Sequence, residues 1–388
     1  MKISAKNKSV GFGAIVLASA LILSACSGTT SSGGSALNEL GDNEGEVNIL
    51  SWPGYVEDGS NYPDYDWVTS FEANTGCMVN AKSYGTSDEA VNLMKTGEYD
   101  VIAASGDATL RLIAAGDVAP VNTDLIPNYE GIYDFLKLQP WNSIDGVSYG
   151  VPHGYGANLL AYNTDVFPVA PTSWSVVFDG ASENSGKISA YDSPIYIADA
   201  AVYLMTHSPE LGITDPYALD ETQLQAAVDL LKGQRLHVGE YWSDWLKAIS
   251  ALDTGDTVAT TTWQVIVNYL AEDTNVATVL PEEGATGWSD TWMVASGAAN
   301  PNCAYAWLDW IASPEANGMA TGFFGEAPSN PEACNYREDC EAFSAGDTEF
   351  AGKLYYWTTP IEDCLDGRTD VKCTDYAQWT EAWTEMKG

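Results

Sequence analysis

Two kinds of side chain that can hold an organic cation are abundant in this chain of 388 residues. It contains 14 tryptophans, 21 tyrosines and 54 aspartates and glutamates. An ammonium group over a tryptophan face gains about 0.5–2 kcal/mol, and a buried cation needs a carboxylate because its desolvation is otherwise too costly. Abundance also makes chance matches easy. Five tryptophans are expected in the core rather than in a site: Trp174, Trp307, Trp310, Trp379 and Trp383.

Residues and motifs for catalysis are scarce by comparison. The only histidines are His153, His207 and His237, and the sequence has no GxSxG elbow, no HExxH and no phosphate-binding loop. Carboxylates are numerous enough to pair for glycoside cleavage, but number alone does not indicate a pair. A structural role is favoured for His153. We therefore expect no catalytic residue, no cofactor and no enzyme, and a secreted hydrolase is only a distant alternative.

The N-terminus has the pattern of an export signal. Lys2, Lys6 and Lys8 precede an apolar run over residues 10–23, which is shorter than the roughly 20 residues that span a bilayer. Leu-Ser-Ala-Cys then ends at Cys26 and resembles the bacterial lipobox. This resemblance implies that residues 1–25 are a lipoprotein signal peptide and that Cys26 is lipidated. An ordinary signal peptide is the alternative.

A stretch rich in Ser, Gly and Thr follows over residues 26–45 and is predicted to be a flexible tether. Behind a lipid anchor, it would hold the rest of the chain at the membrane. The predicted location is the periplasm or the outer face of the cytoplasmic membrane.

Six cysteines remain after Cys26, and an even number in an exported chain indicates disulfides. Short spacing favours Cys334 with Cys340 and Cys364 with Cys373, which leaves Cys77 with Cys303. Fifteen pairings are possible for six cysteines, so the others stay open. Zinc is the rival explanation, but no CxxC spacing occurs and histidines are few. We expect no metal site.

Length and charge restrict the class of protein further. About 360 residues follow the signal peptide, which is more than one core usually supports, so two lobes are expected. The net charge of −38 repels nucleic acid and attracts cations. Since the acids are spread along the whole chain, most of this charge is interpreted as a solvated, salt-adapted surface. No nucleic-acid partner is expected.

From residue 46 onward, short apolar strands alternate with helices. Strands are predicted at residues 47–52, 78–84 and 100–104, and helices at residues 67–75, 87–96 and 108–115. Gly76, Gly97 and Gly116 follow these helices as C-caps. The alternation is typical of βαβ units with a parallel sheet. Trp52 and Ser105 lie at carboxyl ends of strands, where such sheets bind ligands.

A second α/β region begins at residue 186. Its strands are predicted at residues 186–191 and 257–262, and its helices at residues 197–205, 221–232 and 264–271. The pattern then returns to a strand at residues 292–295 and a helix at residues 304–311. The last helix is expected to stop at Ser313-Pro314.

Six segments stand in an order that is found in one protein family. They are ILSWPGYVEDG, GEYDVIAASGDATLRLIAAGDVAPVN, YGVPHGYGANLLAYNTDVF, PTSWSVVFD, GWSDTWMVA and AWLDWIASPEANGMATGFFGEAPSN. With this order and spacing, the sequence resembles the bacterial spermidine/putrescine-binding family of ABC importers from about residue 47 to the C-terminus. No single motif is highly specific.

The resemblance implies an α/β, two-lobed periplasmic-binding-protein fold of type II, in which each lobe is a mixed sheet flanked by helices and a hinged cleft lies between them. The N-terminal lobe would comprise residues 46–155 and 291–335, and the C-terminal lobe residues 156–290 and 336–388. The implied ligand carries ammonium groups that aromatic faces and carboxylates hold.

Carried over position by position, the resemblance assigns aromatic residues on both lobes. Trp52 and Tyr55 match the aromatic pair after the first strand, and Trp263 matches a tryptophan on the opposite lobe. Trp288 and Asp290, in GWSD, match the Trp-x-Asp pair that grips an amine. An ammonium group that is hydrogen-bonded to this aspartate and lies between two indoles would have both the carboxylate partner and the aromatic contact that a buried cation needs.

Polar positions carry over as well. Ser105 matches the serine after the third strand, Asp192 aligns with a pocket aspartate, and Ser243 aligns with a polar contact. Asp290 is thus the expected amine anchor of the site.

Departures from the family leave the second anchor open. Ile195 and Ile266 stand where some members have acids, and Asp107 replaces a tyrosine. Asp107, Asp192 and Glu326 are candidates for the second anchor. If none of them faces the cleft, a ligand with one charge is expected instead.

The function that follows is capture of a polyamine, similar to putrescine or spermidine, by a monomer that delivers it to the permease and ATPase subunits of an ABC importer. The alternative is a protein of the same fold for another cationic or zwitterionic solute: a betaine, a choline-like compound or an amino-acid derivative.

Overall fold

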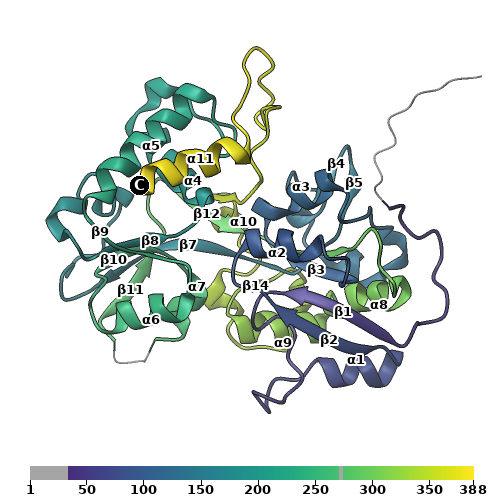
Figure 1. Cartoon of the computed structure of the whole chain (residues 1–388). Helices are drawn as coiled ribbons and strands as arrows, with labels where there is room; N and C mark the ends of the chain where they lie inside the picture. The colour runs from purple at the N-terminus through teal and green to yellow at the C-terminus, as the bar shows by residue number, and fades with distance from the viewer. Residues whose placement is uncertain (1–33, 271–273) are drawn as a thin grey trace, which may run out of the picture. The chain divides into compact units, whose positions relative to one another are not determined.

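The computed structural model describes residues 34–270 and 274–388 (Figure 1). Their buried side chains form two hydrophobic cores. The described residues form one unit. Residues 1–33 lie outside the described part of the chain. They include the predicted signal peptide, Cys26 and the first residues of the predicted tether. Among the residues described, no helix is both long and apolar enough to cross a membrane.

The first sheet has five strands in the order β2-β1-β3-β13-β6. Three of them are parallel, as the alternating pattern predicted, and β13 lies antiparallel between β3 and β6. The strands are β1 (Glu46–Ser51), β2 (Met78–Ser83), β3 (Val101–Ala104), β6 (Val151–Pro152) and β13 (Thr291–Val294). The accompanying helices are α1 (Val68–Thr75), α2 (Ser87–Met94), α3 (Gly106–Ala115), α8 (Pro301–Ile311) and α9 (Pro314–Phe324).

Glycine ends two of these helices for a conformational reason. Gly76 and Gly116 follow α1 and α3 with φ of 73° and 74°, in the left-handed region that a side chain disfavours. Both C-caps agree with the sequence prediction. The third prediction was wrong: α2 ends at Met94 with Lys95 as its C-cap, and Gly97 lies two residues further on, in the turn that follows.

The second sheet is built around the long strand β7, in the order β15-β12-β7-β10-β8-β9, and β11 and β14 also pair with β7. The strands are β7 (Gly154–Asn163), β8 (Ile188–Tyr191), β9 (Val238–Trp242), β10 (Ala259–Trp263), β11 (Val276–Val279), β12 (Ala285–Trp288), β14 (Ala327–Pro328) and β15 (Leu354–Tyr356). The helices are α4 (Ile197–His207), α5 (Glu221–Arg235), α6 (Trp245–Asp253), α7 (Gln264–Asn268), α10 (Thr348–Ala351) and α11 (Tyr376–Lys387). A small hairpin joins β4 (Ser143–Ile144) and β5 (Val147–Ser148).

The chain passes between the two cores more than once. Along β7, Tyr155 belongs to the first core and Ala157 to the second, and the chain returns between Trp288 and Trp292. Each core therefore combines segments that are distant in sequence, which is the two-lobed arrangement expected. The lobe boundaries that we assigned remain predictions.

Ser313-Pro314 lies between two helices, α8 and α9. Ser313-Pro314 was expected only to stop a helix, but Ser313 also caps α9, where its side chain accepts a hydrogen bond from the Ala316 amide. Pro314 occupies the first turn, where its missing N–H costs nothing. The pair thus separates α8 from α9.

Three disulfides join the six cysteines. They are Cys77–Cys303, Cys334–Cys340 and Cys364–Cys373, so the pairing that spacing favoured is confirmed. The first bond ties the segment before β2 to α8 across 226 residues of sequence. Closing a loop of this length restricts the unfolded chain and thereby stabilises the fold.

Most tryptophans expected in the core are there. Trp174, Trp307, Trp379 and Trp383 are buried, and the half-buried Trp310 donates its indole N–H to the Trp67 carbonyl. These rings stabilise the two lobes and leave the cleft to other aromatic residues.

Candidate ligand-binding site

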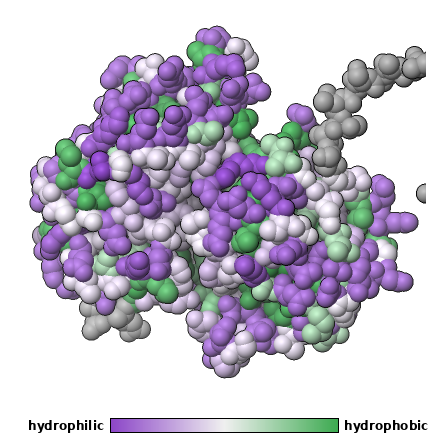
Figure 2. Space-filling view, in the orientation of Figure 1, coloured by the Kyte–Doolittle hydropathy of each residue, from purple (hydrophilic) through white to green (hydrophobic). Residues whose placement is uncertain are grey.

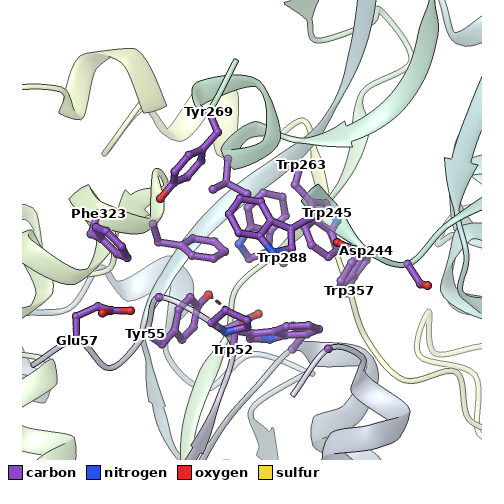
Figure 3. A pocket seen from close by; sticks show the side chains of 18 of the residues that line it. Trp52, Tyr55, Glu57, Asp244, Trp245, Trp263, Tyr269, Trp288, Phe323 and Trp357 are labelled. Carbon is purple, nitrogen blue, oxygen red and sulfur yellow. Dashed lines mark hydrogen bonds between the residues drawn. The ribbon is translucent and has the colours of Figure 1, made fainter. Parts of the chain in front are cut away.

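A cavity of about 390 Å³ lies between the two cores, and aromatic side chains line much of it (Figure 3). This volume is in the usual range for small-molecule sites. Trp52 and Tyr55 come from the first core, whereas Trp288 and Trp357 come from the second. Seven of the predicted ligand-binding residues line the cavity: Trp52, Tyr55, Ser105, Ser243, Trp263, Trp288 and Asp290.

Asp290 is a buried carboxylate between β12 and β13, with 2% of its surface exposed. The Tyr55 hydroxyl donates to its Oδ2 at 3.0 Å, whereas Oδ1 has no hydrogen-bond partner among the described residues. Burial raises the pKa of Asp290 to about 6, and the nearby Ser105 and Tyr55 hydroxyls oppose this rise. Because a buried acceptor without a donor is costly, Oδ1 is suited to a cationic donor from a ligand.

Trp52 and Ser105 meet at the carboxyl ends of two neighbouring parallel strands. Trp52 follows β1, and its indole N–H donates to the Ser105 hydroxyl, after β3, at 3.2 Å. The Trp52 ring centroid is 4.5 Å from that of Tyr84 and 6.1 Å from that of Trp263. Aromatic rings of both cores therefore approach each other at the edge of the sheet where ligands are expected.

Trp288 is held in one orientation at the end of β12. Its ring packs on β7 at Gly156, where a methyl group would stand 2.2 Å from a ring carbon. At the other edge, its indole N–H donates to Glu326 Oε2 at 2.9 Å. The absence of a side chain at Gly156 and the hydrogen bond to Glu326 together fix the orientation in which the indole lines the cavity.

Glu326 therefore lies behind Trp288 and does not line the cavity. Burial, followed by the charge of Asp290, raises its pKa well above the usual range. Its Oε1 lies 3.4 Å from Nε2 of His153, a ring whose pKa burial lowers to about 3. A protonated Glu326 beside a neutral His153 is the arrangement that this environment favours. His153 packs against Tyr55, with ring centroids 4.2 Å apart.

Two predicted residues do not reach the cavity. Asp107 is buried in the first turn of α3, where the Ser87 hydroxyl donates to it at 2.9 Å and burial raises its pKa to about 7. Asp192 follows β8 and is paired with Lys387 of α11 at 2.5 Å, and Trp383 also donates to it. Because each carboxylate is occupied by a partner elsewhere, neither is placed to hold a ligand in this cavity.

Several lining residues were not predicted from the sequence. They come from α6, α7, α9, the segment after β15 and the loop after β1: Trp245, Tyr269, Phe323, Phe324, Trp357, Glu57 and Tyr62, with Asp244 at the start of α6. Trp357 stacks on Tyr191 with ring centroids 5.9 Å apart. Nothing in the local sequence separates these aromatic residues from the core tryptophans, since only packing brings them to the cavity.

Comparison with known proteins identifies the family. The model of the bacterial extracellular solute-binding proteins matches residues 66–343. The chain belongs to this family. A putrescine/cadaverine-binding protein of Pseudomonas aeruginosa is 24% identical over 289 residues, covering 69% of this chain and 78% of the relative. A putrescine-binding periplasmic protein of the same species is 25% identical over 356 residues, covering 86% and 91%.

Solved structures agree on the fold. A spermidine/putrescine ABC transporter substrate-binding protein from Streptococcus pneumoniae has a TM-score of 0.67 at 18% identity, covering 88% of this chain and 97% of that one. The two-lobed type II fold and the family resemblance are thus confirmed for this member.

Proposed function

We propose that this protein captures an organic polyamine between its lobes and delivers it to an ABC importer. One observation carries the proposal: Asp290 is buried at an aromatic cavity with one carboxylate oxygen unpaired. A neutral sugar would leave this charge uncompensated, and an anion would be repelled. An ammonium group would pair with it while methylene groups lay along the indole faces.

Relatives support the polyamine as the first candidate. Those reported above are named for putrescine and cadaverine, and this chain has the Trp-x-Asp pair of Trp288 and Asp290 at the cavity. Because these relatives are binding proteins, a role in transport rather than in catalysis is proposed here too. The expected partners are a membrane permease with its ATPase, and lipidation of Cys26 would anchor the protein at the outer face of the membrane.

A second candidate is a ligand with a single cationic group, such as a betaine or a choline-like compound. It is favoured by the positions of Asp107, Asp192 and Glu326, none of which lines the cavity. The aromatic walls would suit a quaternary ammonium group equally well.

The mechanism that we propose is closure of the lobes over the ligand. The ligand first contacts the lobe that carries Trp52 and Tyr55, and closure then adds Trp263 and Trp357 from the other core. Because these further contacts exist only in the closed form, the ligand shifts the population toward closure, and the closed form is the one that docks on the permease.

Calorimetric titration with putrescine, cadaverine, spermidine, glycine betaine, choline and a neutral sugar tests the proposal. We expect amines to bind the wild-type protein and the Asp290→Asn variant to lose this binding. Asp58→Asn is a matched control, because Asp58 is exposed and its carboxylate accepts from the Ser60 amide. Unchanged affinity in Asp290→Asn, or binding of the sugar alone, would refute the function, whereas binding of choline or betaine alone would establish the second candidate.

A further inference from the structure

Glu57 is an acid at the cavity that no expected role explains. It lies in the loop between β1 and α1 and lines the same cavity as Asp290. Among the described residues, its carboxylate has neither an ion-pair nor a hydrogen-bond partner, although the side chain is only partly exposed. Burial, with a contribution from the charge of Asp58, raises the pKa of Glu57. An acid in this setting gains from a cation.

The loop that carries Glu57 is braced rather than free. The Trp67 amide donates to the Glu57 carbonyl at 3.3 Å, and Asp58 forms a β-bridge with Asp66. Tyr62 packs on Phe323 of α9 with ring centroids 4.9 Å apart. The backbone position of Glu57 is therefore set before any ligand arrives, as a binding residue requires.

The same loop connects Glu57 to the first anchor. Tyr55 stands two residues before Glu57 and donates its hydroxyl to Asp290 at 3.0 Å. Figure 3 shows Glu57 and Tyr55 on one side of the cavity, together with Phe323, and Trp263 on another. Tyr55 also packs edge-on against Phe324, at 4.8 Å between ring centroids. The two carboxylates are thus separated by an aromatic surface that methylene groups can cover.

Asp244, an exposed acid at the cavity, already has a structural role. It caps α6, where its Oδ1 accepts a hydrogen bond from the Leu246 amide at 3.0 Å. Among the described acids, this leaves Glu57 as the lining carboxylate that can take a second cation.

We propose that Glu57 anchors a second ammonium group, so that the cavity takes a linear diamine with one end on Asp290 and the other on Glu57. This inference rests on the proposed capture of an organic amine, and it specifies a dication in place of a monocation. The two anchors differ in kind. Asp290 is buried and holds any ammonium group, whereas Glu57 lies nearer the solvent and selects for chain length.

A series of diamines with three to six methylene groups, each compared with the monoamine of equal length, tests the inference by calorimetry. In the wild-type protein we expect one preferred length and an advantage of the diamine over its monoamine. Glu57→Gln should weaken the preferred diamine by about tenfold or more, as expected for loss of a charge-assisted hydrogen bond, and should leave the monoamine within about twofold. Asp64→Asn is the matched control, because Asp64 is exposed in the same loop and does not line the cavity, and it should leave the diamine advantage intact.

A second variant tests the position of the carboxylate and keeps its charge. Glu57→Asp withdraws the carboxylate by one methylene group, so the preferred diamine should become longer by one methylene group. Equal weakening of diamine and monoamine by Glu57→Gln, or an unchanged length preference in Glu57→Asp, would overturn the second anchor while leaving the first in place. If Asp290→Asn binds amines as the wild-type protein does, or if no amine binds, the proposed function fails as well.

Discussion

Asp290 couples ligand binding to pH at the scale of a single residue. Its pKa is raised to about 6 by burial, so the carboxylate becomes protonated in the ligand-free protein as the pH falls through 6. Since a cation binds only the charged form, we expect amine affinity to fall by up to about tenfold for each pH unit below this value. Titrations between pH 8 and pH 4.5 would show the decline, and a flat profile would contradict it.

The stability of the ligand-free protein should change in the opposite direction. Asp199 is a buried carboxylate of α4 that accepts a hydrogen bond from the Thr286 hydroxyl. Burial raises the folded-state pKa values of Asp107, Asp199 and Asp290 to about 7, 8 and 6. The folded state therefore binds more protons than the unfolded state between pH 4 and these values, and stability decreases as the pH rises through them. Thermal melts should give a higher Tm at pH 6 than at pH 8. The Asp290→Asn variant should lose part of this difference, because the amide still accepts from Tyr55 but does not titrate.

Glu326 is expected to act through Trp288. Glu326→Leu removes the acceptor of the indole N–H and should weaken amine binding by about tenfold, because the cation–π contact depends on the orientation of the ring. Glu326→Gln keeps an acceptor and should remain within about twofold. Calorimetry on the Trp288→Phe background provides the decisive comparison: if Glu326→Leu weakens binding there as well, Glu326 does not act through the indole.

At the scale of an element, β7 contributes to the site at Gly156, where the absence of a side chain leaves room for the Trp288 ring. Gly156→Ala would place a methyl group 2.2 Å from the Trp288 ring, so the ring or the strand must shift. We expect this substitution to lower the free energy of unfolding by about 1–3 kcal/mol and to weaken ligand binding. Chemical denaturation measures the first effect and calorimetry the second.

A glycine of α5 offers the control. Gly233 has open space around its Cα, so Gly233→Ala should be neutral or should raise the free energy of unfolding by up to about 1 kcal/mol. If both alanine variants gave the same stability, the close contact between β7 and Trp288 would be refuted.

At the scale of the whole molecule, charge is the dominant feature. The net charge is −38, and polar residues cover most of the face seen in Figure 2, with apolar residues scattered among them. Only a few acids of the described chain touch the cavity, so most of the charge repels itself across the surface. Salt should relieve this repulsion, because the Debye length falls from about 10 Å at 0.1 M to about 3 Å at 1 M.

We therefore expect the Tm to rise steadily as KCl increases from 0.1 M to 2 M. Sucrose at equal osmolality serves as the uncharged control, since it acts by exclusion from the surface and not by screening. A Tm that does not depend on KCl would show that the acids are already compensated in the folded protein.

Local patterns in the sequence were sufficient for most elements of the first sheet, for two of the three glycine C-caps and for the disulfide pairing, but they missed β7, the central strand of the second sheet, and the helices α6, α9 and α11. They also placed Trp52 and Ser105 at the ends of neighbouring strands, because the local sequence shows where each apolar strand ends. Asp290 was assigned to the site by family resemblance, but only the tertiary structure decided which other acids meet the cavity. Asp192 is neutralised by Lys387 from the last helix, and Glu57 reaches the cavity because its loop packs on α9. Such outcomes depend on contacts between distant segments, and no local pattern encodes them.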